Sequence, residues 1–367
     1  MIFGLFVFLL ILLVLFSIYR LILSYKPKVI VNENGNMAPI LARMKSITKP
    51  FKPTPWLING HFSTVWGIQF RKKSSFKPER EQVDFPDGGN VVLDWFNQNA
   101  PDNAPLLIVC HTLGGGTREP CTNNMCIKGM NHGWKVVVAT CRGANGSKIT
   151  TKRLYDAVRT DDLHFLIQHF KKTINPPHIF VVGFSLGSSI SCIYSTQYDD
   201  VDAVMSISHP VNCEYLADKL EGPLQMKFYI PPMLNAIKKT LAKNQFIPEE
   251  QRKICMAAKT LRDLDEAWTS KELGLPHAED YYRAVTLDEN KIKNAKIPLL
   301  IFNAEDDPFT SQKAVPEKLI RESQNVAYIS TPEGGHVAFI TGINGQRSYV
   351  EDVAIDYFES VLASKIE

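Results

Sequence analysis

A serine between two glycines directly follows an apolar run near the middle of this chain. Residues 178–182 read H-I-F-V-V, and residues 183–187 then read G-F-S-L-G, which matches the pattern G-x-S-x-G. A strand that ends in this pattern predicts a sharp strand-to-helix turn, which lifts the hydroxyl of Ser185 above the edge of a sheet. Glycines suit such a turn because a Cβ atom there clashes with nearby backbone. The pattern therefore predicts a nucleophilic serine on an α/β sheet.

Short apolar runs rich in β-branched residues lie on both sides of this turn. Such runs are typical of strands that are buried on both faces of a mostly parallel sheet. Helical patterns separate them, notably at residues 161–171, where apolar residues recur at helical spacing. This alternation predicts an α/β doubly wound domain. We expect strands at residues 81–85, 90–96, 106–110, 135–140, 179–182, 203–207, 298–302 and 326–330.

Residues 211–296 interrupt the alternation of strands and helices. They are rich in charged and helix-forming residues and lie between two predicted core strands, so we expect an inserted helical cap. The remaining boundaries follow from composition. We expect a membrane anchor at residues 1–25, an extended segment that packs on the core at 26–80, and the α/β core at 81–210 and 297–367.

A nucleophilic serine of this kind needs a histidine base and an acid, in the chain order serine, acid, histidine. His209, His277 and His336 follow Ser185, and only His336 lies in a glycine-flanked loop after the last predicted strand. His209 follows a strand end and His277 lies in the predicted cap. The sequence therefore favours His336 as the base.

The acid is expected just after the strand that ends near residue 302. Three adjacent carboxylates stand there, Glu305, Asp306 and Asp307, and spacing alone does not choose among them. We favour Asp307, which precedes a proline, as the partner that fixes the tautomer of His336. Asp306 is then expected to cap the turn or support the site.

A tetrahedral intermediate also needs backbone N–H donors. One is expected from Leu186, the residue after the nucleophile, and one from the loop after the strand at 106–110. This loop reads H-T-L-G-G-G-T at residues 111–117, and we expect Leu113 to be the donor. The glycines do not predict a phosphate site because no G-K-[ST] follows them.

The N-terminus begins with 18 residues, 2–19, that carry no charge and are mostly Phe, Leu, Ile and Val. A helix over residues 2–23 spans roughly 30 Å, and Arg20 is expected to extend to the membrane interface. A cleaved signal peptide usually has a basic residue before its apolar run, and this chain has none there. We therefore expect an uncleaved single-pass anchor in a membrane. Arg20, Lys26 and Lys28 favour a cytosolic domain.

Composition excludes several other classes of protein. The formal charge is +3 and no long basic run occurs, so nucleic acid is not an expected partner. The seven cysteines include no C-x-x-C pair and no zinc-site spacing, so most are expected to be free thiols. We expect no metal and no cofactor.

Several motifs outside the serine turn identify a family. They include N-G-H at 59–61, D-G-G at 87–89, C-R-G at 141–143, T-L-R-D-L-D at 260–265 and N-A-E-D-D-P at 303–308. With G-G-H at 334–336, the chain resembles the YheT-like branch of α/β-hydrolase-domain proteins, including its membrane-anchored esterases and phospholipases. The resemblance covers the chain from about residue 53 onward.

The resemblance implies that Ser185, Asp307 and His336 hydrolyse carboxylic esters, with acylglycerols or glycerophospholipids as lipid substrates. It also implies one N-terminal span with the domain on the non-cytosolic side, which conflicts with the charge rule and leaves orientation open. Two other activities stay open: acyl transfer to a lipid acceptor, and binding by a catalytically inactive hydrolase fold. The chain differs from relatives at Thr112, where glycine is usual, and it lacks the H-x(4)-D motif linked to acyl transfer.

Overall fold

The fold is built on one large sheet, and the computed structural model describes residues 2–365 of the chain. Side chains at residues 2–6, 8, 9 and 13 lie outside this description. The strands of the large sheet are β1 (Lys28–Ile30), β2 (Glu79–Asp84), β3 (Asn90–Phe96), β4 (Leu106–Cys110), β5 (Lys135–Ala139), β6 (Ile179–Phe184), β7 (Ala203–Ile207), β8 (Leu299–Ala304) and β9 (Val326–Thr331).

The strand order in the sheet is β1-β9-β8-β7-β6-β4-β5-β3-β2. Strands β5, β4, β6, β7, β8 and β9 are parallel, whereas β3 and β2 add antiparallel strands at one edge and β1 at the other. The predicted α/β architecture with a mostly parallel sheet is therefore confirmed, and every expected strand is present. The sequence prediction missed β1, a three-residue edge strand.

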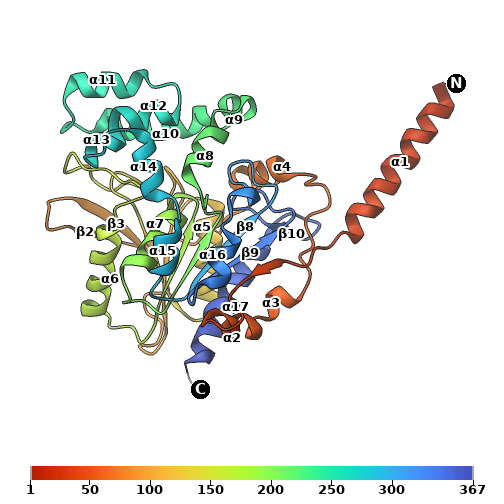
Figure 1. Ribbon diagram of the computed structural model, residues 1–367, viewed down its shortest axis with the longest axis horizontal. Helices are drawn as coiled ribbons and strands as arrows, with labels where there is room; N and C mark the ends of the chain where they lie inside the picture. Colours follow the sequence, from red (N-terminus) through yellow and green to blue (C-terminus); the bar gives the residue numbers. More distant parts are fainter. Residues whose placement is uncertain (1, 366–367) are drawn as a thin grey trace.

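Helices cover both faces of the sheet (Figure 1). Alternate strand residues point to opposite faces, so Leu107 and Val109 of β4 join one buried cluster, while Leu106 and Ile108 join the other. The first face carries α5 (Pro120–Asn131) and α17 (Tyr349–Ser364). The second carries α6 (Asp161–Thr173), α7 (Leu186–Gln197), α15 (Glu289–Lys293) and α16 (Glu317–Glu322).

A group of helices connects β7 to β8 and lies over one end of the sheet (Figure 1). It has a separate apolar cluster around Leu234, Leu241 and Trp268. The division of the chain into anchor, core and cap stays a prediction. The helices are α8 (Cys213–Leu220), α9 (Pro223–Phe228), α10 (Ile230–Lys243), α11 (Glu249–Ala257), α12 (Leu261–Leu264), the π-helix η2 (Asp265–Thr269), α13 (Ser270–Glu272) and α14 (Ala278–Val285), followed by α15.

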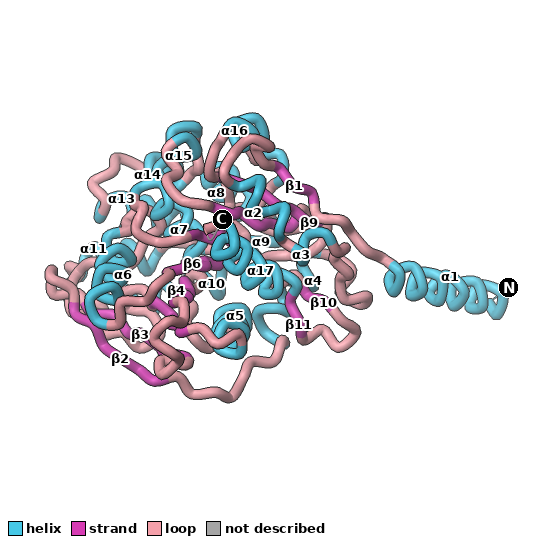
Figure 2. Tube along the Cα trace, turned by 90° about the horizontal axis from the view of Figure 1, so that it is seen from below, coloured by secondary structure: helices cyan, strands magenta, loops and turns pink. Residues whose placement is uncertain are grey.

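The N-terminal helix α1 (Ile2–Ile22) stands away from the rest of the molecule (Figure 2). Among the residues that the structure describes, no helix combines the length and the apolar character needed to cross a membrane. The predicted anchor falls partly on side chains outside the described ones, and it stays a prediction. The later N-terminal elements pack on the domain: α2 (Met37–Arg43), α3 (Lys45–Thr48), α4 (Gly60–Val65) and the π-helix η1 (Trp66–Phe70).

Arg20 lies against the domain, and its expected place at a membrane interface stays a prediction. Its guanidinium forms an ion pair with Glu333, with Nη1–Oε1 at 2.7 Å, and donates to the backbone oxygens of Pro55 and Leu57. The side chain is only 5% exposed. A carboxylate and two carbonyl groups within reach satisfy the guanidinium in this position. The base of α1 is thus attached to the loop that precedes His336.

Candidate active site

Ser185 lies on the sharp turn between β6 and α7 that the sequence predicts. Its φ is 53° and its ψ is −113°, a strained conformation for a residue with a Cβ atom. The turn depends on its glycines: a Cβ at Gly183 would lie 2.2 Å from the Gly187 oxygen, and one at Gly187 would lie 2.4 Å from the Cys110 oxygen. Only glycine allows α7 to approach β4 this closely. The position of the Ser185 hydroxyl therefore depends on both glycines.

The structure brings together the three residues that the sequence selects. The Oγ of Ser185 lies 2.8 Å from Nε2 of His336, and Nδ1 of His336 lies 2.8 Å from Oδ2 of Asp307. Asp307 is 2% exposed, and its Oδ1 accepts hydrogen bonds from the N–H groups of Phe309 and Thr310. This geometry permits His336 to take the serine proton while Asp307 stabilises the imidazolium that forms.

The loop that carries His336 is held by contacts that the sequence did not reveal. The His336 N–H donates to Oγ1 of Thr64 on α4 at 2.8 Å, and the Val337 N–H donates to Oγ of Ser208 at 2.9 Å. The Gly335 N–H donates to Oδ1 of Asp306, in agreement with the supporting role expected for that residue. Thr64 and Ser208 are 272 and 129 residues from their partners, so local patterns carry no sign of either contact.

The two predicted oxyanion donors lie at the same site. Leu186 is the first residue of α7, where backbone N–H groups have no partner within the helix. Leu113 lies in the loop between β4 and α5, and both residues line the same cavity as Ser185 and His336. Among the described residues, neither N–H donates to another protein group. Both N–H groups are therefore available to an oxyanion beside Ser185.

Glu119 supports the loop that contains Leu113. Its carboxylate accepts hydrogen bonds from the Thr112 hydroxyl, from the Thr112 N–H at 3.3 Å and from the Gly116 N–H at 3.4 Å. His111 supports the other side, because its Nε2 accepts from the Cys141 N–H and its backbone oxygen accepts from the Gly187 N–H. Burial lowers the pKa of His111, which keeps its ring neutral and able to accept that hydrogen bond. At position 112, where glycine is usual in relatives, the Thr112 hydroxyl adds a hydrogen bond to Glu119.

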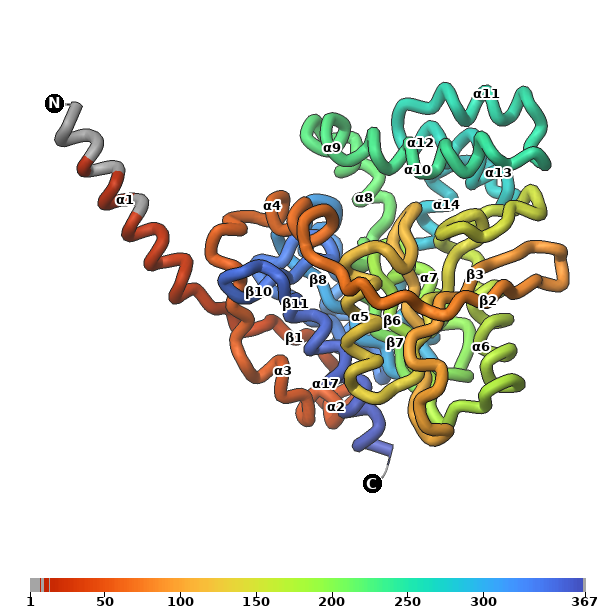
Figure 3. Tube along the Cα trace, turned by 180° about the vertical axis from the view of Figure 1, so that it is seen from behind, coloured from red at the N-terminus to blue at the C-terminus, as the bar shows by residue number. Residues whose placement is uncertain are grey.

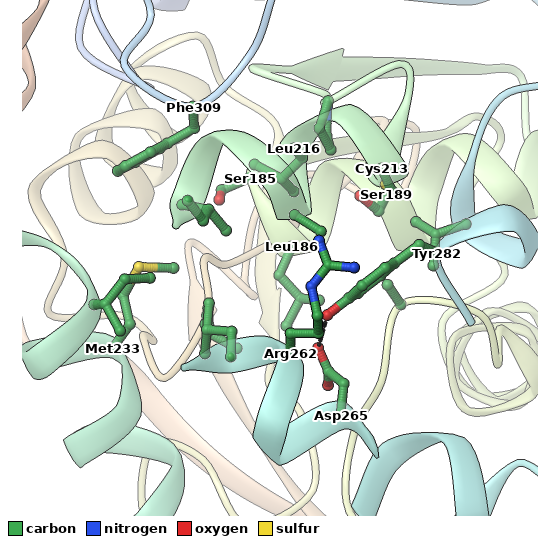
Figure 4. Close-up of a pocket in the computed structure, with 18 of the residues that line it drawn as sticks. Ser185, Leu186, Ser189, Cys213, Leu216, Met233, Arg262, Asp265, Tyr282 and Phe309 are labelled. Carbon is green, nitrogen blue, oxygen red and sulfur yellow. Dashed lines mark hydrogen bonds between the residues drawn. The ribbon is translucent and has the colours of Figure 1, made fainter. Parts of the chain in front are cut away.

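A mostly apolar cavity of about 160 Å³ opens beside Ser185 and His336 (Figure 4). From the sequence alone, Phe228, Tyr229, Ile230 and Met233 fit either an acyl pocket or the ordinary core of the predicted cap. Ile230 and Met233 line the cavity, whereas Phe228 and Tyr229 do not. Phe228 instead points to solvent and is 60% exposed. The other apolar lining residues include Leu216, Leu220, Ile237, Val285 and Phe309.

Polar side chains lie at the end of the cavity away from Ser185 (Figure 4). Oδ2 of Asp265 accepts a hydrogen bond from the Tyr282 hydroxyl at 2.9 Å, and burial raises the pKa of Asp265 to about 6. Arg262 lies over the Tyr282 ring and forms ion pairs with Asp218, Glu221 and Glu279. The cavity thus extends from Ser185 at one end to a charged cluster at the other.

The remaining expectations concern side chains outside the site. His209 is fully buried, and neither of its ring nitrogens has a partner among the described residues. Burial lowers its pKa to about 3, which keeps the ring neutral in the interior. The cysteines are as expected, because all seven are free.

The sheet order, the serine on a strained strand-to-helix turn and the bonded histidine and aspartate define the class of α/β hydrolases. A family profile described as "alpha/beta hydrolase fold" matches residues 105–343. The chain belongs to this α/β-hydrolase-fold family.

Curated relatives extend the similarity to most of the chain. A Dictyostelium discoideum "Abhydrolase domain-containing protein" is 31% identical, over 85% of this chain and 81% of its own length. The "Putative esterase YheT" of Escherichia coli is 27% identical, over 87% of this chain and 96% of its own length. The human "Phospholipase ABHD3" is 25% identical, over 86% of this chain and 80% of its own length. The resemblance to the YheT-like branch is thereby confirmed.

Solved structures show the same fold. The esterase Pf2001 of Pyrococcus furiosus matches with a TM-score of 0.53 at 16% identity, and the match covers 78% of this chain and 92% of that chain. At this identity the likeness concerns the arrangement of strands and helices alone.

Proposed function

We propose that this protein is a membrane-anchored serine hydrolase that cleaves carboxylic esters of lipids, either acylglycerols or glycerophospholipids. The single observation that carries the proposal is the Ser185–His336–Asp307 arrangement, with both linking distances at 2.8 Å, at one end of an apolar cavity. The relatives named as an esterase and a phospholipase support ester hydrolysis as the reaction.

The proposed reaction passes through an acyl-enzyme. Oγ of Ser185 attacks the acyl carbonyl while His336 takes the serine proton, and the N–H groups of Leu113 and Leu186 bind the oxyanion. His336 then gives that proton to the leaving alcohol as the C–O bond breaks. In the second half, His336 takes a proton from water, and the water oxygen attacks the acyl carbonyl. His336 then returns that proton to Oγ of Ser185 as the bond between Oγ and the acyl carbon breaks, and the fatty acid is released.

The apolar lining of the cavity supports a lipid acyl chain as the group that is transferred. Burying methylene groups against Ile230, Met233 and Leu216 contributes about 0.8 kcal/mol for each CH₂. The uncharged run at residues 2–19 supports an anchor that holds the enzyme at its substrate.

Labelling with a fluorophosphonate probe tests the proposal directly. We expect the wild-type chain and Ser189→Ala to be labelled and Ser185→Ala not to be. Ser189 is a suitable control because it lines the same cavity one turn along α7. Equal labelling of Ser185→Ala would rule out the assignment, and an unlabelled wild type would favour an inactive, ligand-binding fold.

Product analysis then identifies the reaction. Incubating wild type and Ser185→Ala with phosphatidylcholine or with monoacylglycerol is expected to release free fatty acid only with wild type. Release of a new acyl ester when lysolipid is added, in place of fatty acid, would instead show acyl transfer.

A further inference from the structure

Large apolar side chains are exposed together around α4. Single exposed apolar residues are ordinary, but a contiguous group of them marks a surface that binds a protein or a membrane. Their exposed fractions run from 36% to 74%. We call this group the α4 patch, and its members are Trp56, Ile58, Phe62, Val65, Phe70 and Ile343.

Direct contacts make the α4 patch one surface. The indole Nε1 of Trp56 donates to the backbone oxygen of Ile343 at 2.8 Å. Trp56 packs edge-on against Trp66, with ring centroids 4.4 Å apart, and Trp66 stacks on Phe70 at 5.6 Å. Phe62 and Val65 lie one turn apart on α4 itself. Trp56, Trp66, Phe70 and Ile343 thus form one connected group from distant parts of the chain, next to the exposed side chains of α4.

The chain segment that carries most of the α4 patch is basic. Residues 34–78 contain eight Lys or Arg residues and no Asp or Glu. Lys52 and Lys72 are exposed beside the patch: the Lys52 oxygen accepts from Thr341, and the Lys72 N–H donates to Gln346, on the hairpin that carries Ile343. Apolar and aromatic side chains bordered by cations match the interface of an anionic bilayer.

The α4 patch is continuous with the base of α1. Arg20 of α1 donates to the backbone oxygens of Pro55 and Leu57, the residues on either side of Trp56. Figures 1 and 3 place α4 between the base of α1 and α9. A bilayer that receives α1 therefore meets the α4 patch at the same edge of the molecule.

The other side of α4 contacts the active site. Thr64 accepts from the His336 N–H, and a Cβ at Gly60 would lie 1.8 Å from the Asp306 oxygen, so α4 packs directly on the loops of both residues. His61 lies 3.0 Å from the Tyr229 hydroxyl, next to Phe228, which is also exposed. The patch thus lies just outside the proposed reaction centre.

We infer that the α4 patch is a membrane-contacting surface that rests in the headgroup region of an anionic phospholipid bilayer and keeps the mouth of the active site against it. The biological role of this surface, bringing the active site to its substrate, rests on the proposed action on lipid esters. The surface itself follows from exposed apolar residues, the exposed Lys52 and Lys72 beside them, and continuity with α1.

The full-length chain in vesicles of phosphatidylcholine mixed with phosphatidylserine tests this surface. Brominated phosphatidylcholine quenches tryptophans that enter the bilayer, and only Trp56 and Trp66 can report, since Trp95, Trp134 and Trp268 are at most 6% exposed. We expect strong quenching in wild type. The variant Phe62→Ser/Ile343→Ser is expected to weaken docking by at least roughly a hundredfold, because each lost side chain alone should weaken it by about tenfold. Quenching should fall accordingly.

A matched control has the same two changes elsewhere. Phe246→Ser/Ile254→Ser removes a similarly exposed Phe and Ile at and before α11, far from α1 (Figure 1), and should quench like wild type. The patch variant should also hydrolyse vesicle lipid more slowly while hydrolysing a short p-nitrophenyl ester at the wild-type rate.

Each alternative outcome is decisive. Equal quenching in wild type and patch variant would overturn the inference. So would a patch variant that keeps its quenching but changes from dimer to monomer, because the occupant is then a second copy. If no chain hydrolyses either ester and the quenching difference remains, the proposed function fails while the membrane surface stands.

Discussion

Glu119 illustrates how a residue outside the reacting atoms controls them. Its carboxylate holds Thr112 and Gly116, the residues that frame Leu113. A Cβ at Gly115 would lie 2.1 Å from that carboxylate, so the loop closely surrounds it. Glu119 is therefore a positioning residue for the proposed oxyanion donor.

Replacing Glu119 tests this role. Loss of an oxyanion donor reduces kcat by about 10²–10³-fold, and misplacing one should reduce it less, by roughly tenfold. We expect Glu119→Ala to lower kcat on a short p-nitrophenyl ester with little change in KM, and Glu119→Gln, which keeps an acceptor, to recover most of the rate. A fall in stability without that kcat pattern would indicate a purely structural role.

Asp306 gives a pH-dependent prediction. Its Oδ2 is buried without a partner among the described residues, and burial, with the nearby Glu333 and Asp307, raises its pKa to about 6. The folded state thus keeps a proton that the unfolded state loses above about pH 4. Stability is lost as the pH rises from about 4 to 6.

Asp306→Asn keeps the acceptor for the Gly335 N–H but carries no charge. It should be more stable than wild type at pH 7, by up to about 3 kcal/mol, since one pKa unit corresponds to about 1.4 kcal/mol. Urea unfolding at pH 4 and pH 7 measures the difference, which should shrink at the lower pH. A difference independent of pH would contradict this prediction.

The site residues that could be predicted from the sequence are those that stand in recognisable local motifs. Ser185 stands in a recognisable pentapeptide, and His336 lies in a glycine-flanked loop after a strand. Glu119 and Thr64 were missed because their roles depend on hydrogen bonds to chain segments that only folding brings near. Asp307 was chosen among three carboxylates by a proline, and its contact with His336 required the structure.

Among the elements, η1 and α17 are joined by a buried ion pair. Nη1 and Nη2 of Arg71 donate to Oε1 and Oε2 of Glu351, at 2.6 and 2.7 Å, and the side chains are 3% and 8% exposed. Buried pairs of this kind contribute little net stability, but a single lost partner leaves an unpaired charge.

The pair predicts a strong non-additivity. Arg71→Met alone should lower the free energy of unfolding by about 3–5 kcal/mol, whereas Arg71→Met with Glu351→Met should recover most of that loss. Chemical unfolding of the single and double variants measures the coupling. Additive losses would show that the two side chains act independently.

Elements were easier to predict where burial is continuous. Strands such as β4 and β6 lie inside the sheet, and their continuous apolar sequences predict that position. Strand β1 has only three residues and pairs antiparallel with β9, 298 residues or more away, so no local pattern reveals it. The π-helices η1 and η2 were missed because their residues follow ordinary helical patterns.

At the scale of the whole molecule, the cavity between the sheet and helices α8–α15 should set acyl-chain length. Met233 on α10 faces the space near Ser185 (Figure 4), so Met233→Trp fills part of it. We expect this variant to hydrolyse a p-nitrophenyl butyrate normally and a p-nitrophenyl palmitate at least roughly tenfold more slowly, since overpacking costs about 1–3 kcal/mol. An equal loss on both esters would place the effect outside the cavity.

The contact between Arg20 and Glu333 has a practical consequence for making this enzyme in the laboratory. A boundary drawn after the apolar helix removes Arg20 and leaves the Glu333 carboxylate without its bidentate partner, three residues before His336. A shortened protein that begins just before Arg20 should therefore retain more of its turnover than one that begins at Lys26. For crystallisation or assay, the useful starting point of the chain lies inside the last turn of α1.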